Sequence, residues 1–232
     1  MARRSRVERA DFAASAPQRI LTRPVPLRQS VYETLAEMII DGTLKPGQRL
    51  VEVDLAAMLG VSRQPVREAL QHMQNLGWVD LRPGFGATVH VPAEDEVDQL
   101  LAARAAIETE SARMAARRIT DDGIEELRAL RTRGVACLDA EDINGAVKAN
   151  SELHRRITEI AGNKFLIQFA AQVDQRVRWY YTPVAKVRGR DSWDEHSRLI
   201  DAIAAHDEEQ AARIMREHTG LTQTAYQQTQ LP

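Results

Sequence analysis

The sequence has little cysteine and no long apolar run, and both absences narrow what the chain can be. Cys137 is the only cysteine among 232 residues, so neither an intrachain disulfide nor a cluster of thiolate metal ligands can form within one chain. No apolar stretch approaches the roughly 20 residues that a membrane-spanning helix needs. The first residues are rich in arginine but contain no apolar core of signal-peptide length. We therefore expect a cytoplasmic protein with no membrane partner.

An excess of one charge is also lacking, because the net charge is only -2. The distribution is uneven, however: residues 1–26 carry six arginines against Glu8 and Asp11, whereas residues 27–91 are nearly balanced and the remainder is acidic. The basic arm over 1–26 is either a disordered, solvated tail or a segment that lies along DNA phosphates, and both interpretations stay open. The chain length is typical of two domains.

Three helices are predicted over the segment that follows the arm. Apolar residues recur at helical spacing from Val31 to Ile39 and again from Leu55 to Leu59, where Gly60 ends the pattern. Ser62 is a natural N-cap for a third helix, and Pro65 falls in its first turn, where a missing N–H costs little. The third helix has one apolar stripe and one polar face.

A two-stranded hairpin is predicted behind the third helix. Apolar residues alternate with a period of two over 79–81 and 87–91, and a turn rich in glycine separates the two runs. Two short helices followed by such a hairpin are typical of a winged helix-turn-helix. We predict this domain over 27–91, followed by a linker over 92–96.

The first turn of the third helix would carry the residues that read DNA. Arginine can bond O6 and N7 of guanine, and glutamine can bond N6 and N7 of adenine. An N-cap hydroxyl and the amides at a helix start suit a phosphate. The alternative is that these arginines are ordinary exposed residues without a role in binding. However, an N-cap, an apolar stripe, a basic face and a hairpin occur together in this segment. The predicted DNA-binding residues are Ser62, Arg63, Gln64 and Arg67 from the helix and Arg82 and Gly84 from the wing.

Only helical periodicity follows, so the predicted fold is mainly α, with the winged domain followed by an all-helical bundle over 97–232. Helices are expected over 95–118, 121–139, 142–161, 164–182, 192–205 and 208–227.

Polar residues interrupt the apolar stripes of several of these helices. Asn150 and His154 share the stripe of the helix over 142–161, and His196 and His218 lie on the stripes of the last two helices. Together they are a workable site for a divalent transition metal with open coordination positions. A hydrogen-bonded core histidine is the plain alternative for each one alone. Arg104, on another apolar stripe, could clamp a bound carboxylate.

Other polar residues are weaker candidates. Arg176 and Tyr180 lie on a plausible inward stripe and could help to shape a ligand pocket. His72, His90 and His206 show no convergence with the other histidines, so we expect them at the surface.

Two stretches resemble known families. Residues 55–70, LAAMLGVSRQPVREAL, preceded by LKPGQRL, resemble the signature of the GntR superfamily. The remainder resembles the FCD effector domain of the FadR-like subfamily, so that the likeness covers roughly residues 27–222. Its motifs are Arg104 with Glu108, NSELH over 150–154, AGN over 161–163, EH over 195–196, and His218.

The resemblance implies that Arg63 and Arg67 contact operator DNA and that the wing tip enters the minor groove. It also implies a homodimer whose helical domain binds small organic acids at a divalent metal such as zinc or nickel. Three positions depart from many relatives, which have Thr at Gln64, Arg at Val53 and Asp at Asn150. A neutral carboxamide binds a dication more weakly than a carboxylate does.

The expected function is that of a ligand-responsive transcription regulator, a repressor of double-stranded operator DNA that a small organic acid releases. A metal-dependent enzyme acting on a small carboxylate is one alternative, but no HExxH motif or comparable general base accompanies the histidines. A DNA-binding protein without an effector is the other alternative. Apolar residues in place of four inward polar residues would have favoured it, namely Arg104, His154, His196 and His218. We do not expect an enzyme.

Overall fold

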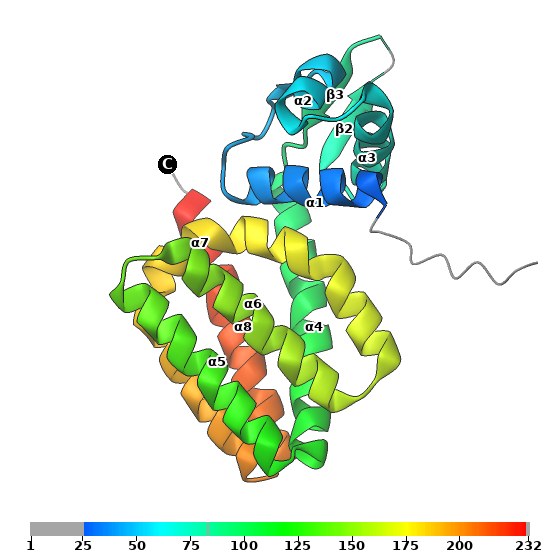
Figure 1. The fold of residues 1–232 in the computed structure, drawn as a ribbon. Coiled ribbons are helices and arrows are strands. Elements are labelled where there is room, and N and C mark those ends of the chain that lie inside the picture. Colours follow the sequence, from blue (N-terminus) through cyan, green and yellow to red (C-terminus); the bar gives the residue numbers. More distant parts are fainter. Residues whose placement is uncertain (1–25, 83, 231–232) are drawn as a thin grey trace, which may run out of the picture.

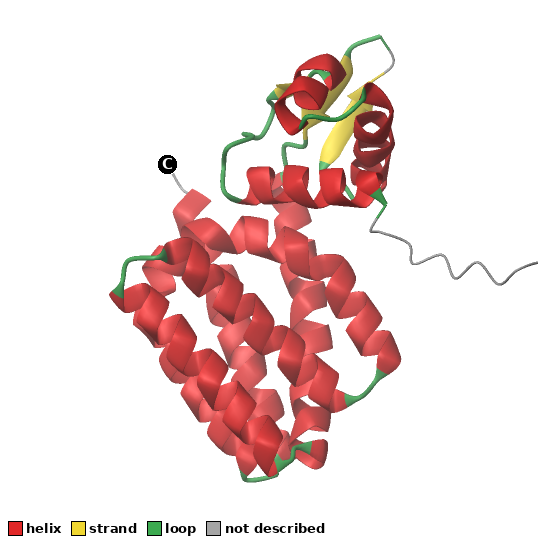
Figure 2. Ribbon diagram, in the orientation of Figure 1, coloured by secondary structure: helices red, strands yellow, loops and turns green. Residues whose placement is uncertain are grey.

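The computed structural model describes residues 26–82 and 84–230, which form a small N-terminal domain and a larger helical bundle. The strands are confined to the small domain, and the bundle is helical throughout (Figure 2). The predicted fold class is therefore confirmed. Apart from Pro26, the basic arm lies outside the described residues.

The small domain packs three helices against a short sheet. Its buried core includes Leu35 and Ile39 from the first helix, Val66 and Met73 from the third, and Trp78 before the sheet. The elements in chain order are α1 Leu27–Ile40, β1 Arg49–Leu50, α2 Glu52–Leu59, α3 Arg63–Asn75, β2 Val79–Arg82 and β3 Gly86–Val89.

The sheet has one strand more than predicted. β2 and β3 form the expected antiparallel hairpin, with Val79 opposite Val89, and we call this hairpin and its turn the wing. β1 pairs with the other edge of β3, with Arg49 opposite Thr88, so the strand order is β1-β3-β2. Two residues are too few for an alternating pattern to be visible in the sequence.

The bundle consists of five helices, and α4 extends into it directly from the small domain (Figure 1). Its largest fully buried side chains include Leu127, Leu153, Ile157, Leu199 and Met215. Within the described ranges, no helix is both long and apolar enough to cross a membrane. The helices are α4 Glu94–Arg118, α5 Asp121–Asp139, α6 Ile143–Ala161, α7 Lys164–Ala204 and α8 Glu208–Gln230.

Two boundaries differ in position from those predicted. The linker expected over 92–96 ends earlier, because α4 begins at Glu94. The break expected over 183–191 is present but shorter than predicted, because α7 consists of two helices that meet at a kink at Gly189, where φ is 38° and ψ is -125°. Burial of Val184 and Ala185 in a local apolar cluster stabilises the helix where its periodicity is weak.

The two domains touch along the middle of α7. The carboxylate of Glu37 on α1 accepts hydrogen bonds of 2.7 and 2.9 Å from Arg178. The indole rings of Trp78 and Trp179 stack with their centroids 5.6 Å apart. The same helix therefore belongs to the core of the bundle and to the domain junction.

Candidate nucleic-acid interface and histidine cluster

The turn between α2 and α3 presents the start of α3 to solvent. Gly60 ends α2 in the left-handed region, with φ at 65°, a conformation that glycine adopts without strain. Ser62 is the N-cap of α3, as predicted, but its hydroxyl makes no capping hydrogen bond. The exposed hydroxyl and the first amides of α3 are thus available to an anion such as a phosphate.

A groove of about 630 Å³ lies between α3 and the wing and is strongly basic. Arg49, Arg63, Arg67 and Arg82 line it, whereas Glu52 is the only acidic residue among its described lining residues. Glu52 accepts hydrogen bonds of 2.9 and 2.8 Å from Arg67, and its carboxylate lies 3.4 Å from Arg63. The hydrogen bond from Arg67 lowers the pKa of Glu52. One acid therefore holds two arginines on a surface suited to a polyanion.

The structure brings most of the predicted DNA-binding residues to this surface. Arg63, Arg67 and Arg82 line the groove, and Gly84 lies at the wing tip with φ at 79°. Gln64 is exposed on α3 outside the lining and donates a 2.8 Å hydrogen bond to Glu68. Sequence reasoning missed Arg49, because its side of the groove is built by the short strand β1.

Three buried histidines from three helices meet inside the bundle. The Nε2 atom of His196 on α7 lies 3.2 Å from Nε2 of His154 on α6 and 3.3 Å from Nε2 of His218 on α8. The three side chains could hold a metal ion. The prediction that these three histidine side chains point into the bundle is thus confirmed.

Carboxylates flank the outer nitrogens of two of these rings. Nδ1 of His218 donates a 2.8 Å hydrogen bond to Glu195, and Nδ1 of His154 lies 2.9 Å from Oε2 of Glu108. Each carboxylate also has a cationic partner: Arg104 donates a 2.9 Å hydrogen bond to Glu108, and Arg188 is paired with Glu195. Carboxylates behind metal-binding histidines are common, because they fix the tautomer and the ring orientation.

The protonation pattern of the cluster favours a cation. An imidazole whose Nδ1 proton points to a carboxylate presents the Nε2 lone pair to the centre. Burial, followed by the neighbouring His218 and His154, lowers the pKa of His196 well below its usual value. Burial likewise lowers the pKa of His218 to about 4. Neutral rings with converging lone pairs are what a divalent transition metal requires.

Asn150 lies one helical turn before His154 and is also buried. Its side-chain oxygen Oδ1 has no hydrogen-bond partner. A buried acceptor without a partner destabilises the folded state unless another group, such as a metal ion, binds it. This amide oxygen could therefore join the three histidine nitrogens as a ligand of a divalent metal.

A cavity of about 320 Å³ adjoins the cluster through His154. Arg104, Glu108 and His154 line one part of it, and the wall from α7 is largely apolar, with Ile167 and Val177 among its residues. Burial would raise the pKa of Glu108, but the Arg104 guanidinium and the hydrogen-bonding groups beside the carboxylate lower it to about 2. The Nη1 atom of Arg104 is buried and has no hydrogen-bond partner. The lining of this cavity thus includes an arginine with an unsatisfied buried donor, next to the candidate metal ligand His154.

Arg176 and Tyr180 do not line this cavity, so their role in shaping a ligand pocket stays a prediction. Arg176 bonds Glu96 at the start of α4 and donates a 3.0 Å hydrogen bond to the Tyr180 hydroxyl, at the domain junction. The two residues share a helical face that points to the small domain, whereas Gln175 and Val177 line the cavity. Both faces of this part of α7 pack against other elements. The helical periodicity alone therefore does not show which face lines the cavity and which face points to the small domain.

His90 requires a correction, because it is half-buried at the junction rather than a surface residue. Its Nε2 lies 2.8 Å from Glu96, and its Nδ1 lies 3.1 Å from Asp80. Burial opposes protonation, but the hydrogen bonds to the two carboxylates raise the pKa of His90.

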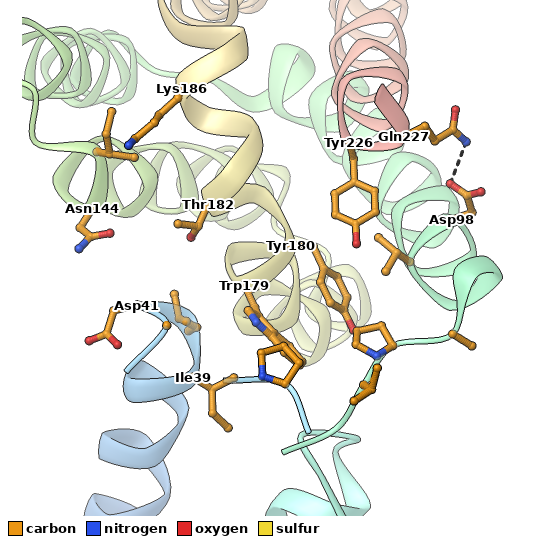
Figure 3. A pocket seen from close by; sticks show the side chains of 18 of the residues that line it. Ile39, Asp41, Asp98, Asn144, Trp179, Tyr180, Thr182, Lys186, Tyr226 and Gln227 are labelled. Carbon is orange, nitrogen blue, oxygen red and sulfur yellow. Dashed lines mark hydrogen bonds between the residues drawn. The ribbon is translucent and has the colours of Figure 1, made fainter. Parts of the chain in front are cut away.

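A larger cleft of about 1270 Å³ opens between the domains beside these contacts. Lys186 and Thr182 of α7 and Tyr226 of α8 are among the side chains around it (Figure 3). Gln227 of α8 donates a 3.0 Å hydrogen bond to Asp98 of α4 at its margin. The domain junction is therefore packed along one part of α7 and open along another.

Comparisons with known proteins agree with both parts of this architecture. Residues 27–89 match the family described as bacterial regulatory proteins, gntR family, and residues 99–221 match the FCD domain. The uncharacterized HTH-type transcriptional regulator YdhC of Bacillus subtilis is 27% identical over 209 residues, covering 85% of this chain and 90% of that protein. The Nta operon transcriptional regulator of Aminobacter aminovorans is 28% identical over 187 residues, covering 78% and 85%.

The fold is also similar to that of the Escherichia coli protein McbR/YncC. The TM-score is 0.78 at 22% sequence identity, with 89% of this chain and 99% of that chain covered.

Proposed function

Because the chain belongs to the GntR family of bacterial regulatory proteins and carries an FCD domain, it is a DNA-binding transcription regulator, and we propose that a small organic acid controls it. In this proposal α3 and the wing bind double-stranded operator DNA. The acid binds in the cavity beside the histidine cluster and changes the affinity for DNA. The single observation that carries the acid site is the buried Nη1 of Arg104, which has no hydrogen-bond partner and belongs to a residue that lines a ligand-sized cavity together with His154.

Charge balance supports an anionic ligand at this cavity. Glu108 and Glu195 are each paired with an arginine, and the histidines of low pKa are neutral, so the side-chain charges nearly cancel. Asn150, His154, His196 and His218 would hold a divalent ion such as zinc or nickel, which would supply positive charge and open coordination positions. Arg104 would then orient the acid by donating to its carboxylate.

The DNA part of the proposal rests on the basic groove. A side chain that enters the major groove must be exposed, and Arg63 and Arg67 have side chains that are 59% and 48% exposed. Their hydrogen bonds to Glu52 would have to be exchanged, at least partly, for contacts to bases and phosphates. A homodimer would place two such α3 helices on one pseudo-palindromic site, and repression relieved by the acid is the direction of control that we propose.

The DNA contacts are tested by selecting a site from random DNA with the full chain and footprinting it. We expect a two-fold site, and we expect Arg63→Ala with Arg67→Ala to weaken its binding by at least about a hundredfold, since good bidentate base contacts contribute about 1–3 kcal/mol each. Arg128→Ala with Arg216→Ala removes two exposed arginines of the bundle and is the matched control. Unaltered binding by the first pair would overturn the assignment.

The acid site is tested by metal analysis followed by calorimetry. The full chain is loaded with zinc or with nickel and titrated with citrate, succinate, lactate and benzoate. We expect one metal per chain, and we expect His154→Ala to lose metal and to weaken acid binding at least about tenfold. The proposal of a metal-containing acid pocket fails if the purified chain binds neither ion and His154→Ala leaves acid affinity unchanged.

A further inference from the structure

Gln175 belongs at once to the cavity and to the domain junction. It is among the residues of α7 that line the cavity beside His154. Its side-chain oxygen Oε1 also accepts a hydrogen bond from the hydroxyl of Tyr32 on α1, 143 residues earlier in the chain. One amide therefore joins the wall of the cavity to a helix of the DNA-binding domain.

Tyr32 in turn contacts α3. It is buried, and its ring packs edge-on against the ring of His72 with the centroids 5.0 Å apart and an angle of 67° between the planes. His72 lies in the last turn of α3, the helix whose first turn carries Arg63. A movement of the Tyr32 ring would thus be felt by α3, because closely packed elements transmit displacement.

We propose that Gln175 is a positioning residue that reports an acid in the cavity to α3 through Tyr32 and His72. This inference rests on the proposed function, since it names the route by which that acid would act.

The chemistry of the amide makes such a response reasonable. A glutamine side chain has one oxygen that accepts and an NH₂ group that donates two hydrogen bonds. The oxygen is used by Tyr32, whereas a carboxylate in the cavity can accept from the NH₂ group. An acid that draws the amide toward itself lengthens or breaks the bond to Tyr32, and a buried hydroxyl that loses its acceptor favours a different position of the ring.

The contact between Arg178 and Glu37 also joins the two domains, but it does not involve a residue that lines the cavity. Arg178 holds Glu37 through two hydrogen bonds of 2.7 and 2.9 Å, and neither residue lines the cavity. Arg178→Gln therefore loosens the junction without touching the proposed route. It is the matched control for a specific path as opposed to a general loosening of the domains.

The experiment measures DNA affinity of the full chain by fluorescence anisotropy, without acid and with citrate, succinate, lactate or benzoate. The coupling factor is the ratio of the two dissociation constants. We expect Gln175→Leu and Tyr32→Phe each to reduce the wild-type coupling factor at least about threefold, and the double variant to reduce it no further. Arg178→Gln should keep the wild-type coupling factor. Circular dichroism checks that each variant is folded.

Several outcomes overturn the inference alone. It fails if Gln175→Leu and Tyr32→Phe keep the wild-type coupling factor, or if Arg178→Gln loses as much. It also fails if the two substitutions change acid-free DNA affinity independently, so that their effects multiply in the double variant. That comparison needs no acid, so it decides the inference even if none of the four acids acts. A wild-type chain that binds an acid without any change in DNA affinity instead overturns the proposed function.

Discussion

Lowering the pH from 7 to 5 should destabilise the metal-free bundle by about 2 kcal/mol through His218 alone. Burial lowers the pKa of His218 to about 4 in the folded chain, against 6.5 for the ordinary group. Between these two values the unfolded chain binds a proton that the folded chain does not bind. The free energy of unfolding therefore falls as the pH falls through this window, and the full difference amounts to about 3 kcal/mol.

Two other histidines alter the size of the effect. Burial also lowers the pKa of His196, so its contribution has the same sign. His90 acts in the opposite direction: burial lowers its pKa, but the bonds to Glu96 and Asp80 raise it overall. A raised pKa gives stability that is fully present below the unfolded pKa and is lost as the pH rises through the folded pKa.

The assay is urea unfolding of the EDTA-treated chain at pH 5, 6 and 7, followed by circular dichroism of the helices. His90→Gln removes the opposing contribution and should show the steeper loss of stability in acid. His218→Gln should flatten the pH dependence by about 2 kcal/mol between pH 7 and 5. Equal free energies of unfolding at pH 5 and 7 in the His90→Gln variant would refute the buried, neutral state of the cluster.

Two further substitutions test the surroundings of the cluster. Asn150→Asp should tighten zinc binding at least about tenfold in a competition titration, because a carboxylate replaces an unpartnered amide oxygen; weaker binding would place Asn150 outside the donor set. Gly134→Ala should lower the free energy of unfolding by about 1–3 kcal/mol, because its methyl group would overlap the Trp193 indole. The control Gly220→Ala meets nothing within 4 Å and should raise stability by up to about 1 kcal/mol, and equal effects of the two substitutions would contradict the packing described.

The histidine cluster was predictable because the helical period fixes the direction of each side chain. His154, His196 and His218 lie on strongly apolar stripes, so each had to point into the bundle, where their Nε2 atoms meet. The start of α3 was predictable for a similar reason, since Ser62 and Gly60 are local signals for a helix start and a helix end.

The junction was not predictable, because the pattern within one element does not show which other element will pack against it. Nothing near His90 in the sequence shows that Glu96 will reach its ring, although the two residues are six positions apart. On α7, Arg176 and Gln175 are neighbours whose partners lie on different helices, Glu96 on α4 and Tyr32 on α1, so periodicity could not assign those partners. Arg188 was missed because it lies in the segment where a gap between helices was expected.

The most direct test of the account is whether one acid changes the affinity for DNA through the histidine cavity. Labelled operator is titrated with zinc-loaded wild-type chain and with His154→Ala, each with and without the acid that calorimetry identifies. The account predicts that the acid changes the wild-type dissociation constant at least about fivefold and leaves that of His154→Ala unchanged. Identical wild-type dissociation constants with and without a demonstrably bound acid would contradict it.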